Sequence, residues 1–541
     1  RPQRVGLHQG TCQNSEMRLA PRTHLRWGAN LHSLRFFYDR TMMPTPDLQL
    51  LREPKWRAED LGAPLPDSAH ANSVCLPHWR DITDYEEKNP RVMERLRAGY
   101  PRFVVPAQCA DFFAVCGRRF AGPDERCHAY PSERSADRCA DYIKRWSGQT
   151  ARVVAWPDRR VFVVCFPAAV EAAALKYWRH TGEGISSRHA ESLIAGRMEV
   201  DSAEARARVM ERLSGLLHIP ASHLYLFKSG MAGLFTLHRM ATQARPEGAC
   251  VQFGFPYVDT LKIQQEFGYR STFFPLGAAA DIKLFGRLAA LDQLAAVFCE
   301  FPSNPLLSSP DLAALSRICR AQRIPLIVDD TVSSCVNVDL RAAADVIVTS
   351  LTKYFTGRGD VMAGLVAINP ESPLAEDITR RFRAEYEDTT WGDNLVLLDH
   401  YSQDFPERMA KINRTAERIT DWLAARPDVA TVYYPKHQQR ELYDAFKRPD
   451  GGYSGLFSVL LRNAATRTEP FYNALQICKG PNLGTTFSLC CPFTLLAHYD
   501  ELEWAERCGV SRYLLRFSIG LEEPDDLIAR LEHAFRKSEA G

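Results

Sequence analysis

Residues 344–364, ADVIVTSLTKYFTGRGDVMAG, decide the fold of this chain. The apolar run at 345–349 is typical of a buried strand, and a Ser-Leu-Thr turn follows it. Lys353 then stands before the aromatic residues Tyr354 and Phe355, in a setting where a lysine is rarely buried without a partner. A surface lysine whose aliphatic stem lies along apolar side chains is the simpler explanation. The segment therefore predicts a strand end that carries a candidate functional lysine.

Similar apolar runs precede this segment. Those at 224–227, 295–300 and 325–329 alternate with helical periodicities, which is the pattern of βα units. The chain is therefore predicted to have an α/β fold, with a mostly parallel sheet and helices on both faces. After about residue 400, a long helical stretch precedes strand-like runs at 454–461 and 514–518 and an amphipathic helix at 524–537. This part is predicted to be a smaller C-terminal α+β domain.

The chain divides into four predicted parts. Residues 1–65 are rich in arginine and poor in acids at their start, and then rich in proline. They are expected to be a poorly ordered extension, with a transit peptide as the alternative. Residues 66–180, with a strand-like run at 160–166 and an alanine-rich helix at 168–178, are predicted to be an N-terminal α/β extension. Residues 181–400 form the large domain, and residues 401–541 the C-terminal domain.

Composition excludes several classes of protein. Of 541 residues, 45% are apolar and 24% are charged, and the net charge is only +2, so no global field recruits nucleic acid or an anionic membrane. The apolar stretch at 161–178 is interrupted by Pro167 and Glu171, so no membrane span is expected. The spacing of Cys109, Cys116, Cys127 and His128 fits no common zinc pattern, and no metal is expected. A reduced, cytoplasmic protein with buried thiols is favoured.

Polar residues directly after two other apolar runs are the next candidates, because ligands of open α/β sheets bind beyond the carboxyl ends of the strands. Asp329 closes one run, and Asn304 follows another within Pro-Ser-Asn-Pro. A strand-end carboxylate and a proline-rich turn are their ordinary explanations. Asp329 and Lys353 are 24 positions apart, which fits one strand-to-strand step. The carboxylate and the amine are therefore expected at neighbouring strand ends.

A glycine turn supplies the third element of the pattern. In YLFKSGMAG (225–233), a strand leads through Ser229, Gly230 and Met231 into a helix. Free backbone N–H groups and the positive end of the helix dipole make such a turn an anion site, although an ordinary capped helix is the simpler explanation when the turn stands alone.

The three features together predict a pyridoxal-phosphate site in the large domain. Such a site needs a lysine for a Schiff base, a carboxylate for the pyridinium nitrogen and a helix N-terminus for the phosphate. Lys353, Asp329 and the turn at Gly230 have these properties. Ser350 and Thr352 would add hydroxyl donors to the phosphate, and Tyr257 could lie over the ring.

The same residues carry a resemblance to a known family. The chain resembles the Cys/Met-metabolism pyridoxal-phosphate enzymes, of the type-I aminotransferase fold, and most of all their fungal cystathionine γ-synthase-like branch. The resemblance covers roughly residues 180–541, and 73–103 also resembles the N-terminal extension of that branch. Its motifs are SGMAG (229–233), YVDT (257–260), PSNP (302–305), VDDT (328–331), SLTKYFTG (350–357), NLGTTFSL (482–489) and LLRFSIGLEEPDDLIARLEHAF (514–535).

The resemblance implies a role for each site residue. Lys353 would bind the cofactor, Asp329 would pair with the ring nitrogen, and Tyr257 would stack on the ring. Arg516 would hold the substrate α-carboxylate in a bidentate manner. The remaining implied contacts to cofactor or substrate come from the backbone of Gly230 and Met231 and from the side chains of Ser350, Thr352 and Asn304.

One segment departs from the family. Its usual Tyr-Ser-Arg is Ser186-Ser187-Arg188 here, so the tyrosine is missing. The resemblance implies a homodimer or homotetramer in which Arg188 reaches the phosphate of the neighbouring subunit. A solvated arginine on a helix surface is the alternative.

The resemblance implies a transferase that acts on a small amino-acid substrate. The expected reaction is γ-replacement on an O-acyl-homoserine-like compound, with a thiol or a carbon nucleophile. A γ- or β-lyase, an O-acylhomoserine sulfhydrylase and a degenerate homologue without chemistry remain alternatives. The residues do not separate γ-replacement, the lyase reaction and the sulfhydrylase reaction, because these differ in pocket shape and water exclusion.

Overall fold

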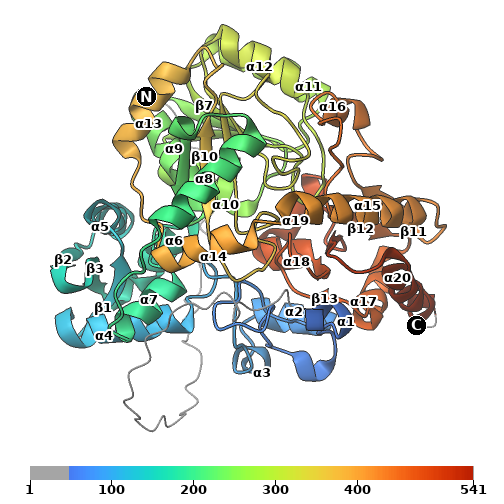
Figure 1. Cartoon of the computed structure of the whole chain (residues 1–541), viewed down its shortest axis with the longest axis horizontal. Coiled ribbons are helices and arrows are strands. Elements are labelled where there is room, and N and C mark those ends of the chain that lie inside the picture. Colours follow the sequence, from blue (N-terminus) through green and yellow to red (C-terminus); the bar gives the residue numbers. More distant parts are fainter. Residues whose placement is uncertain (1–47, 540–541) are drawn as a thin grey trace.

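A seven-stranded sheet forms the centre of the computed structural model, which describes residues 48–539 (Figure 1). The antiparallel strand β10 lies between β4 and β9, and the other neighbours are parallel. Across the sheet, the strands are β4 (Leu224–Phe227), β10 (Gly364–Ile368), β9 (Val346–Thr349), β8 (Leu326–Asp329), β7 (Leu294–Glu300), β5 (Ala249–Phe253) and β6 (Arg270–Phe274).

Both faces of this sheet are buried, because successive strand residues point to opposite sides. In β4, Leu224 and Leu226 belong to one apolar cluster, and Tyr225 and Phe227 belong to another. The first cluster includes residues of α8 (Ala203–Leu217), α11 (Ala279–Leu291) and α12 (Leu312–Ala321), and the second includes residues of α6 (Glu171–Thr181), α9 (Gly230–Ala244), α10 (Val258–Phe267) and α13 (Ala375–Glu385). The predicted α/β fold, with a mostly parallel sheet and helices on both faces, is confirmed.

A second sheet lies in the C-terminal part, as predicted. Its neighbours are antiparallel except for β13 and β14. The strand order is β11 (Val429–Tyr433), β12 (Leu456–Leu461), β15 (Leu515–Ser518), β14 (Leu489–Pro492) and β13 (Cys478–Lys479). The helices of this part are α14 (Gly392–Tyr401), α15 (Phe405–Ala424), α16 (Arg440–Asp444), α17 (Ala464–Ala474), α18 (Phe493–His498), η5 (Tyr499–Glu501), α19 (Leu502–Arg507) and α20 (Pro524–Glu539).

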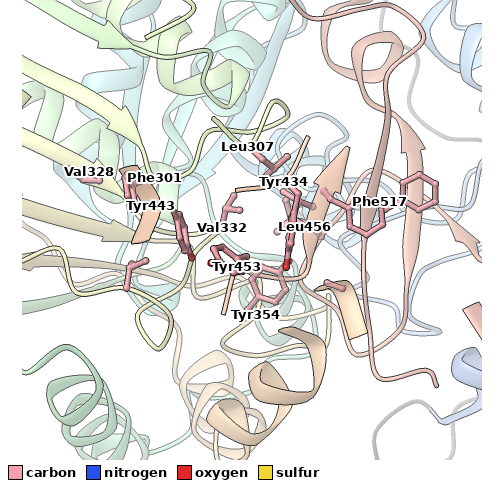
Figure 2. Packing of buried hydrophobic residues seen from close by; sticks show 14 of the residues in the cluster. Phe301, Leu307, Val328, Val332, Tyr354, Tyr434, Tyr443, Tyr453, Leu456 and Phe517 are labelled. Carbon is pink, nitrogen blue, oxygen red and sulfur yellow. The ribbon is translucent and has the colours of Figure 1, made fainter. Parts of the chain in front are cut away.

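The two sheets share one hydrophobic core, shown in Figure 2. Phe301, just after β7, stacks on Tyr443 with the ring centroids 5.5 Å apart. Tyr354 lies fully buried in the same cluster, together with Leu456 of β12 and Phe517 of β15. Because Tyr354 directly follows Lys353, this core fixes the backbone that carries the lysine.

The N-terminal region has a small antiparallel sheet of β1 (Glu125–Tyr130), β3 (Val161–Pro167) and β2 (Arg152–Trp156). The predicted strand at 160–166 corresponds to β3, and the predicted helix at 168–178 to η3 (Ala168–Val170) and α6. Between this sheet and β4, or within the sheet region, also lie the helices α4 (Ala107–Phe120), α5 (Glu133–Ser147), η2 (Pro157–Arg159), α7 (Ser187–Ile194) and η4 (Ala221–His223). The cysteines of the described chain are all buried and free, including Cys127 and Cys165, whose sulfurs lie 3.2 Å apart.

The segment before this sheet packs against the C-terminal domain. It contains α1 (Leu48–Arg52), η1 (Ala58–Asp60), α2 (Trp79–Glu86) and α3 (Pro90–Met93). Leu50 and Leu65 lie in one cluster with Cys478 and Leu489 of the C-terminal sheet. Residues 48–65, expected to be poorly ordered, are therefore packed, because their apolar side chains cover the β13 edge. The rest of that expected extension, residues 1–47, lies outside the described residues.

No helix in residues 48–539 is long and apolar enough to cross a membrane. In the same residues, no group of three or more histidine, cysteine, aspartate or glutamate side chains converges as a metal site.

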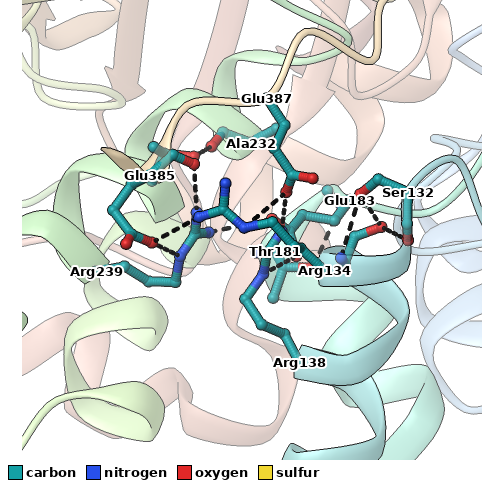
Figure 3. A network of polar contacts seen from close by, with 12 residues as sticks. Ser132, Arg134, Arg138, Thr181, Glu183, Ala232, Arg239, Glu385 and Glu387 are labelled. Carbon is teal, nitrogen blue, oxygen red and sulfur yellow. Dashed lines mark hydrogen bonds and ion pairs between the residues drawn. The ribbon is translucent and has the colours of Figure 1, made fainter. Parts of the chain in front are cut away.

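A network of charges joins the N-terminal region to the large domain (Figure 3). The buried Glu183 accepts hydrogen bonds from Arg138 of α5 at 2.6 and 3.1 Å and from Arg239 of α9 at 3.1 Å. Glu387, just after α13, binds Arg138, and Glu385, the last residue of α13, binds Arg239. Burial alone would raise the pKa of Glu183, but Arg239 and Arg138 lower it below its ordinary 4.5.

We expect Glu183→Gln to lower the free energy of unfolding by about 3–5 kcal/mol at pH 7, because it leaves two guanidinium groups without their shared anion. A carboxyl with a lowered pKa stabilises the fold above its unfolded pKa and loses this effect as pH falls. Wild type should therefore lose stability as pH falls below 4.5, and the variant should lose less. Urea denaturation of wild type and variant, at pH 7 and again below pH 4.5, measures these differences. Glu204→Gln is the control, because the Glu204 side chain is 92% exposed. Equal stability of Glu183→Gln and wild type would contradict the prediction.

Candidate active site

Lys353 lies in a turn directly after β9, pressed between the core and a second loop. A Cβ added to Gly484 would lie 2.8 Å from the carbonyl carbon of Lys353, so only glycine allows this approach. The approach brings Asn482 to the lysine, whose Nζ donates a hydrogen bond to Asn482 Oδ1 at 2.6 Å. The nitrogen of the same amide, Asn482 Nδ2, is buried without a protein partner.

The surroundings of Lys353 shift the pKa of its amine. Burial lowers the pKa of Lys353, and the cations Arg516 and Arg102 lower it further, whereas Tyr100 opposes them. A lysine with a lowered pKa can act as a nucleophile toward a carbonyl or as a general base. The role of Lys353 as the reactive amine stays a prediction.

Asp329 ends β8, opposite Glu300 at the end of the neighbouring strand β7. Asp329 Oδ1 accepts the backbone N–H of Thr331 at 2.8 Å. Burial raises the pKa of Asp329, and burial together with the charge of Asp329 raises that of Glu300. A cation beside two crowded carboxyl groups at one sheet edge would stabilise their ionised forms. Asp329 thus suits the nitrogen of a pyridinium ring.

Glu300 also organises the strand ends. Its carboxylate accepts the backbone N–H of Tyr257 at 2.5 Å and that of Asn304 at 2.9 Å. Both sequence-predicted residues are thereby held at the same edge as Asp329. The sequence analysis did not single out Glu300, although it closes the strand before Pro-Ser-Asn-Pro.

The glycine turn begins α9, where Ser229 caps the helix by accepting the N–H of Ala232 at 3.1 Å. A Cβ added to Gly230 would lie 3.1 Å from Cβ of Ser350, so the helix start packs on the end of β9. Ser350 N donates in turn to Thr331 Oγ1 at 2.8 Å. The Gly230–Met231 turn, Ser350 and the Asp329 loop are therefore contiguous, as a site for a phosphate on an aromatic ring requires.

Thr352 faces another part of the fold. Its buried hydroxyl donates to the carbonyl of Ala363 at 3.1 Å and accepts the N–H of the same residue at 3.0 Å. Its contact with a phosphate stays a prediction.

Arg516 of β15 comes close to Asn304. Its guanidinium donates to Asn304 Oδ1 at 3.1 Å and to the carbonyl oxygens of Pro481 and Asn482. The nearby acids Glu522 and Glu523 bind other residues: Glu522 accepts two hydrogen bonds from Ser488, and Glu523 pairs with Lys411. Arg516, Asn304, Asn482 and Lys353 therefore lie in one cluster.

Arg188 does not join this cluster within the chain. It binds Asp360, with 3.3 Å between Nη2 and Oδ2, and Ser186, which stands where the family has tyrosine, caps α7. The contact of Arg188 with a neighbouring subunit stays a prediction.

Two residues from far upstream enter the site. Arg102 is buried, pairs with Asp259 and donates a hydrogen bond to the Tyr257 hydroxyl. Tyr100 lies against Lys353, with its ring centroid 4.6 Å from Nζ. Both stand in the segment 73–103, whose resemblance to the fungal extension was the one signal that could have found them.

These observations test the fit of pyridoxal phosphate. Lys353, Asp329, Tyr257, Ser350 and Tyr100 each keep part of their surface exposed, although most of their neighbours are buried. We infer that they face one opening, into which the unpartnered amide of Asn482 also fits. An amine, a carboxylate, a helix N-terminus and an aromatic ring converge there, and the residues fit the cofactor.

Comparison with known proteins decides the family. The family model of the Cys/Met metabolism PLP-dependent enzymes matches residues 205–536. The family model of the fungal trans-sulfuration enzyme N-terminal domain matches residues 108–186. The chain belongs to this family. Its cofactor is therefore pyridoxal phosphate, as the sequence analysis predicted, and the type-I aminotransferase fold is confirmed.

Individual relatives resemble the chain over most of its length. It is 31% identical to cystathionine gamma-synthase of Neurospora crassa, over 89% of this chain and 98% of that protein. It is also 31% identical to the cystathionine gamma-synthase-like protein ankD of Aspergillus thermomutatus, over 89% and 95%. The crystal structure of a cystathionine gamma-lyase of Micromonospora echinospora, CalE6, matches with a TM-score of 0.53 and 27% identity, over 61% of this chain and 86% of that one.

Proposed function

We propose that this member of the family catalyses γ-replacement on an O-acyl-homoserine-like amino acid, with a thiol or a carbon nucleophile as the second substrate. The observation that supports this most is the pairing of Arg516 with Asn304 beside Lys353. It places a fork for an α-carboxylate next to an amine that can take the α-proton. The match to a fungal synthase over 89% of the chain supports the replacement reaction.

The side chains divide the work as follows. Bound pyridoxal phosphate would supply a sink for the electron pair that remains when the Cα–H bond breaks. Arg516 binds and orients the α-carboxylate, and Asn304 fixes the plane of its guanidinium. Asp329 holds a proton on the ring nitrogen. Lys353 removes the α-proton and can deliver it to a neighbouring carbon, because burial lowers the pKa of its amine and so favours the form that can accept a proton.

A lyase or a sulfhydrylase would use the same residues, with water or sulfide in the second step. The relatives named above include both a synthase and a lyase. The reaction is therefore identified by which nucleophile is found in the product.

Incubation of the loaded protein with O-acetyl- or O-succinyl-homoserine, with and without cysteine, separates these reactions. The proposed function predicts a replacement product that forms only when a nucleophile is present, and with cysteine this product is a thioether. Rapid release of a keto acid and ammonia without a nucleophile would identify a lyase instead. A matched control is protein treated with borohydride after cofactor loading, in which the covalent link to Lys353 can no longer open.

We expect Arg516→Lys to lose about 1.5–3 kcal/mol of transition-state stabilisation, measured as a fall in kcat/KM. This is the scale of a hydrogen bond to a charged group, and an ammonium cannot reproduce the two parallel bonds of the fork. The loss should be equal for O-acetyl- and O-succinyl-homoserine, which share the α-carboxylate. Arg512→Lys is the control, since Arg512 pairs with Glu506 at the surface. Loss of one substrate alone would place Arg516 at the acyl group.

A further inference from the structure

A tight turn of the N-terminal segment reaches the reactive lysine. The backbone N–H groups of Phe103 and Val104 both donate to the carbonyl of Tyr100 at 2.9 Å, which closes the chain into a turn. The ring of Phe103 lies 5.7 Å from that of Tyr100. Tyr100 therefore stands on a short, internally bonded loop, more than 250 positions before Lys353 in the sequence.

This turn is anchored on two sides. Trp178 Nε1 donates to the carbonyl of Pro101 at 3.1 Å, and Arg102 donates to the carbonyl of Arg179 at 2.7 Å. On the other side, Arg102 pairs with Asp259, which is fully buried and also binds His180 at 2.9 Å. Withdrawal of Arg102 would leave a buried carboxylate with less compensation, so the turn is held against the large domain.

Tyr100 is in direct contact with Lys353. The Nζ atom lies 4.6 Å from the centroid of the Tyr100 ring, and the guanidinium carbon of Arg102 lies 5.4 Å from the same centroid. The cations Arg516 of β15 and Arg102 also act on the lysine, and Tyr257 lies beyond Arg102. Among the groups that shift the pKa of Lys353, Tyr100 is the one that can carry negative charge.

We propose that Tyr100 is a positioning residue that holds the Lys353 amine protonated in the cofactor-free protein and accepts its proton when the amine attacks a carbonyl. In that step an N–H bond breaks and an O–H bond forms at the phenol. The electron pair stays on nitrogen and becomes the nucleophile. The inference rests on the proposed function only in taking Lys353 as the reactive amine.

The electrostatics of the pair gives the sign of the effect. Burial, Arg516 and Arg102 lower the pKa of Lys353, and the Tyr100 oxygen raises it. Burial alone would raise the pKa of Tyr100, but Lys353 and Arg102 lower it. Removal of the phenol oxygen therefore leaves Lys353 with the influences that favour the neutral amine.

The test is the pH dependence of Lys353 acetylation in full-length, cofactor-free protein, with limiting acetic anhydride and mass spectrometry of the lysine peptide. We expect the midpoint of the Tyr100→Phe profile to lie at lower pH. Labelling at pH 7 should be faster by about tenfold for every pH unit by which the midpoint falls. Tyr269→Phe is the control, because Tyr269 is 65% exposed. Better access to the lysine would raise the rate at every pH without moving the midpoint. An unmoved midpoint, or one at higher pH, would overturn the proposal.

A second measurement reads the other partner of the pair. The phenolate absorbance of wild type should contain one tyrosine that ionises below the rest. This step should be absent in Tyr100→Phe and should move to higher pH in Lys353→Met, where the cation is lost. Its persistence in Tyr100→Phe would also overturn the proposal. Covalent capture of pyridoxal phosphate in the same preparations bears on the proposed function alone, so the two failures are distinguishable.

Discussion

Lys353→Ala should abolish the covalent attachment of pyridoxal phosphate, and with it the visible absorption that borohydride removes by trapping. The physical reason is the position of the amine, which donates to Asn482 and follows β9, the neighbour of the strand that Asp329 ends. The variant loses both the amine and the methylenes that carry it, so no other atom can take over at that point. Absorbance spectra and peptide mass spectrometry after borohydride treatment measure the loss.

Lys228 provides the matched control, because it is the rival amine near the phosphate turn. It is buried, its pKa is lowered by burial to about 7, and it stands directly before Ser229. Its Nζ, however, donates to the backbone carbonyl of Glu183 at 3.3 Å, and the side chain of Glu183 lies in the charge network of Figure 3. Lys228→Gln should therefore keep the absorption. A band that survives in Lys353→Ala and disappears in Lys228→Gln would assign the cofactor to Lys228.

The fold was largely predictable, because apolar runs and short turns are local signals. The strand expected at 325–329 is β8, and that at 345–349 is β9, each within one residue of its observed start. The amphipathic helix at 524–537 is α20. Packing of residues 48–65 could not be predicted, since their apolar side chains cover an edge strand more than 400 positions away.

The candidate site was predictable only where it follows strands. Asp329, Asn304 and Lys353 follow apolar runs, and parallel strands bring their carboxyl ends to one edge. Tyr100 and Arg102 lie in an irregular turn with no periodicity, and the partner that fixes Arg102, Asp259, is 157 positions away. Arg188 shows the reverse case: its motif suggested a role between subunits, and within the chain it binds Asp360.

Asp329→Asn is expected to cause the second large loss. A carboxylate beside a pyridinium nitrogen raises the pKa of that nitrogen by about 1–3 units, as an opposite charge at contact distance does. Each unit corresponds to about 1.4 kcal/mol, so the neutral amide should lower the rate of α-proton exchange by roughly 10- to 1,000-fold. The substitution should leave the fold intact, because it removes a carboxylate that raises the pKa of the buried Glu300. Exchange of the substrate α-proton in deuterium oxide, followed by NMR, is the measurement.

The neighbouring Asp330 makes the decisive comparison, because the two carboxylates differ by one position and point to opposite sides of the strand end. Asp330 is almost fully buried, accepts a hydrogen bond from Thr349, and has its pKa raised by burial to about 7. Asp329 instead keeps part of its surface exposed toward the opening. Asp330→Asn should therefore leave α-proton exchange near the wild-type rate, whatever it does to stability. Slow exchange in Asp330→Asn together with normal exchange in Asp329→Asn would transfer the ring-nitrogen role to Asp330, and would require the strand end to face the cofactor with its other side.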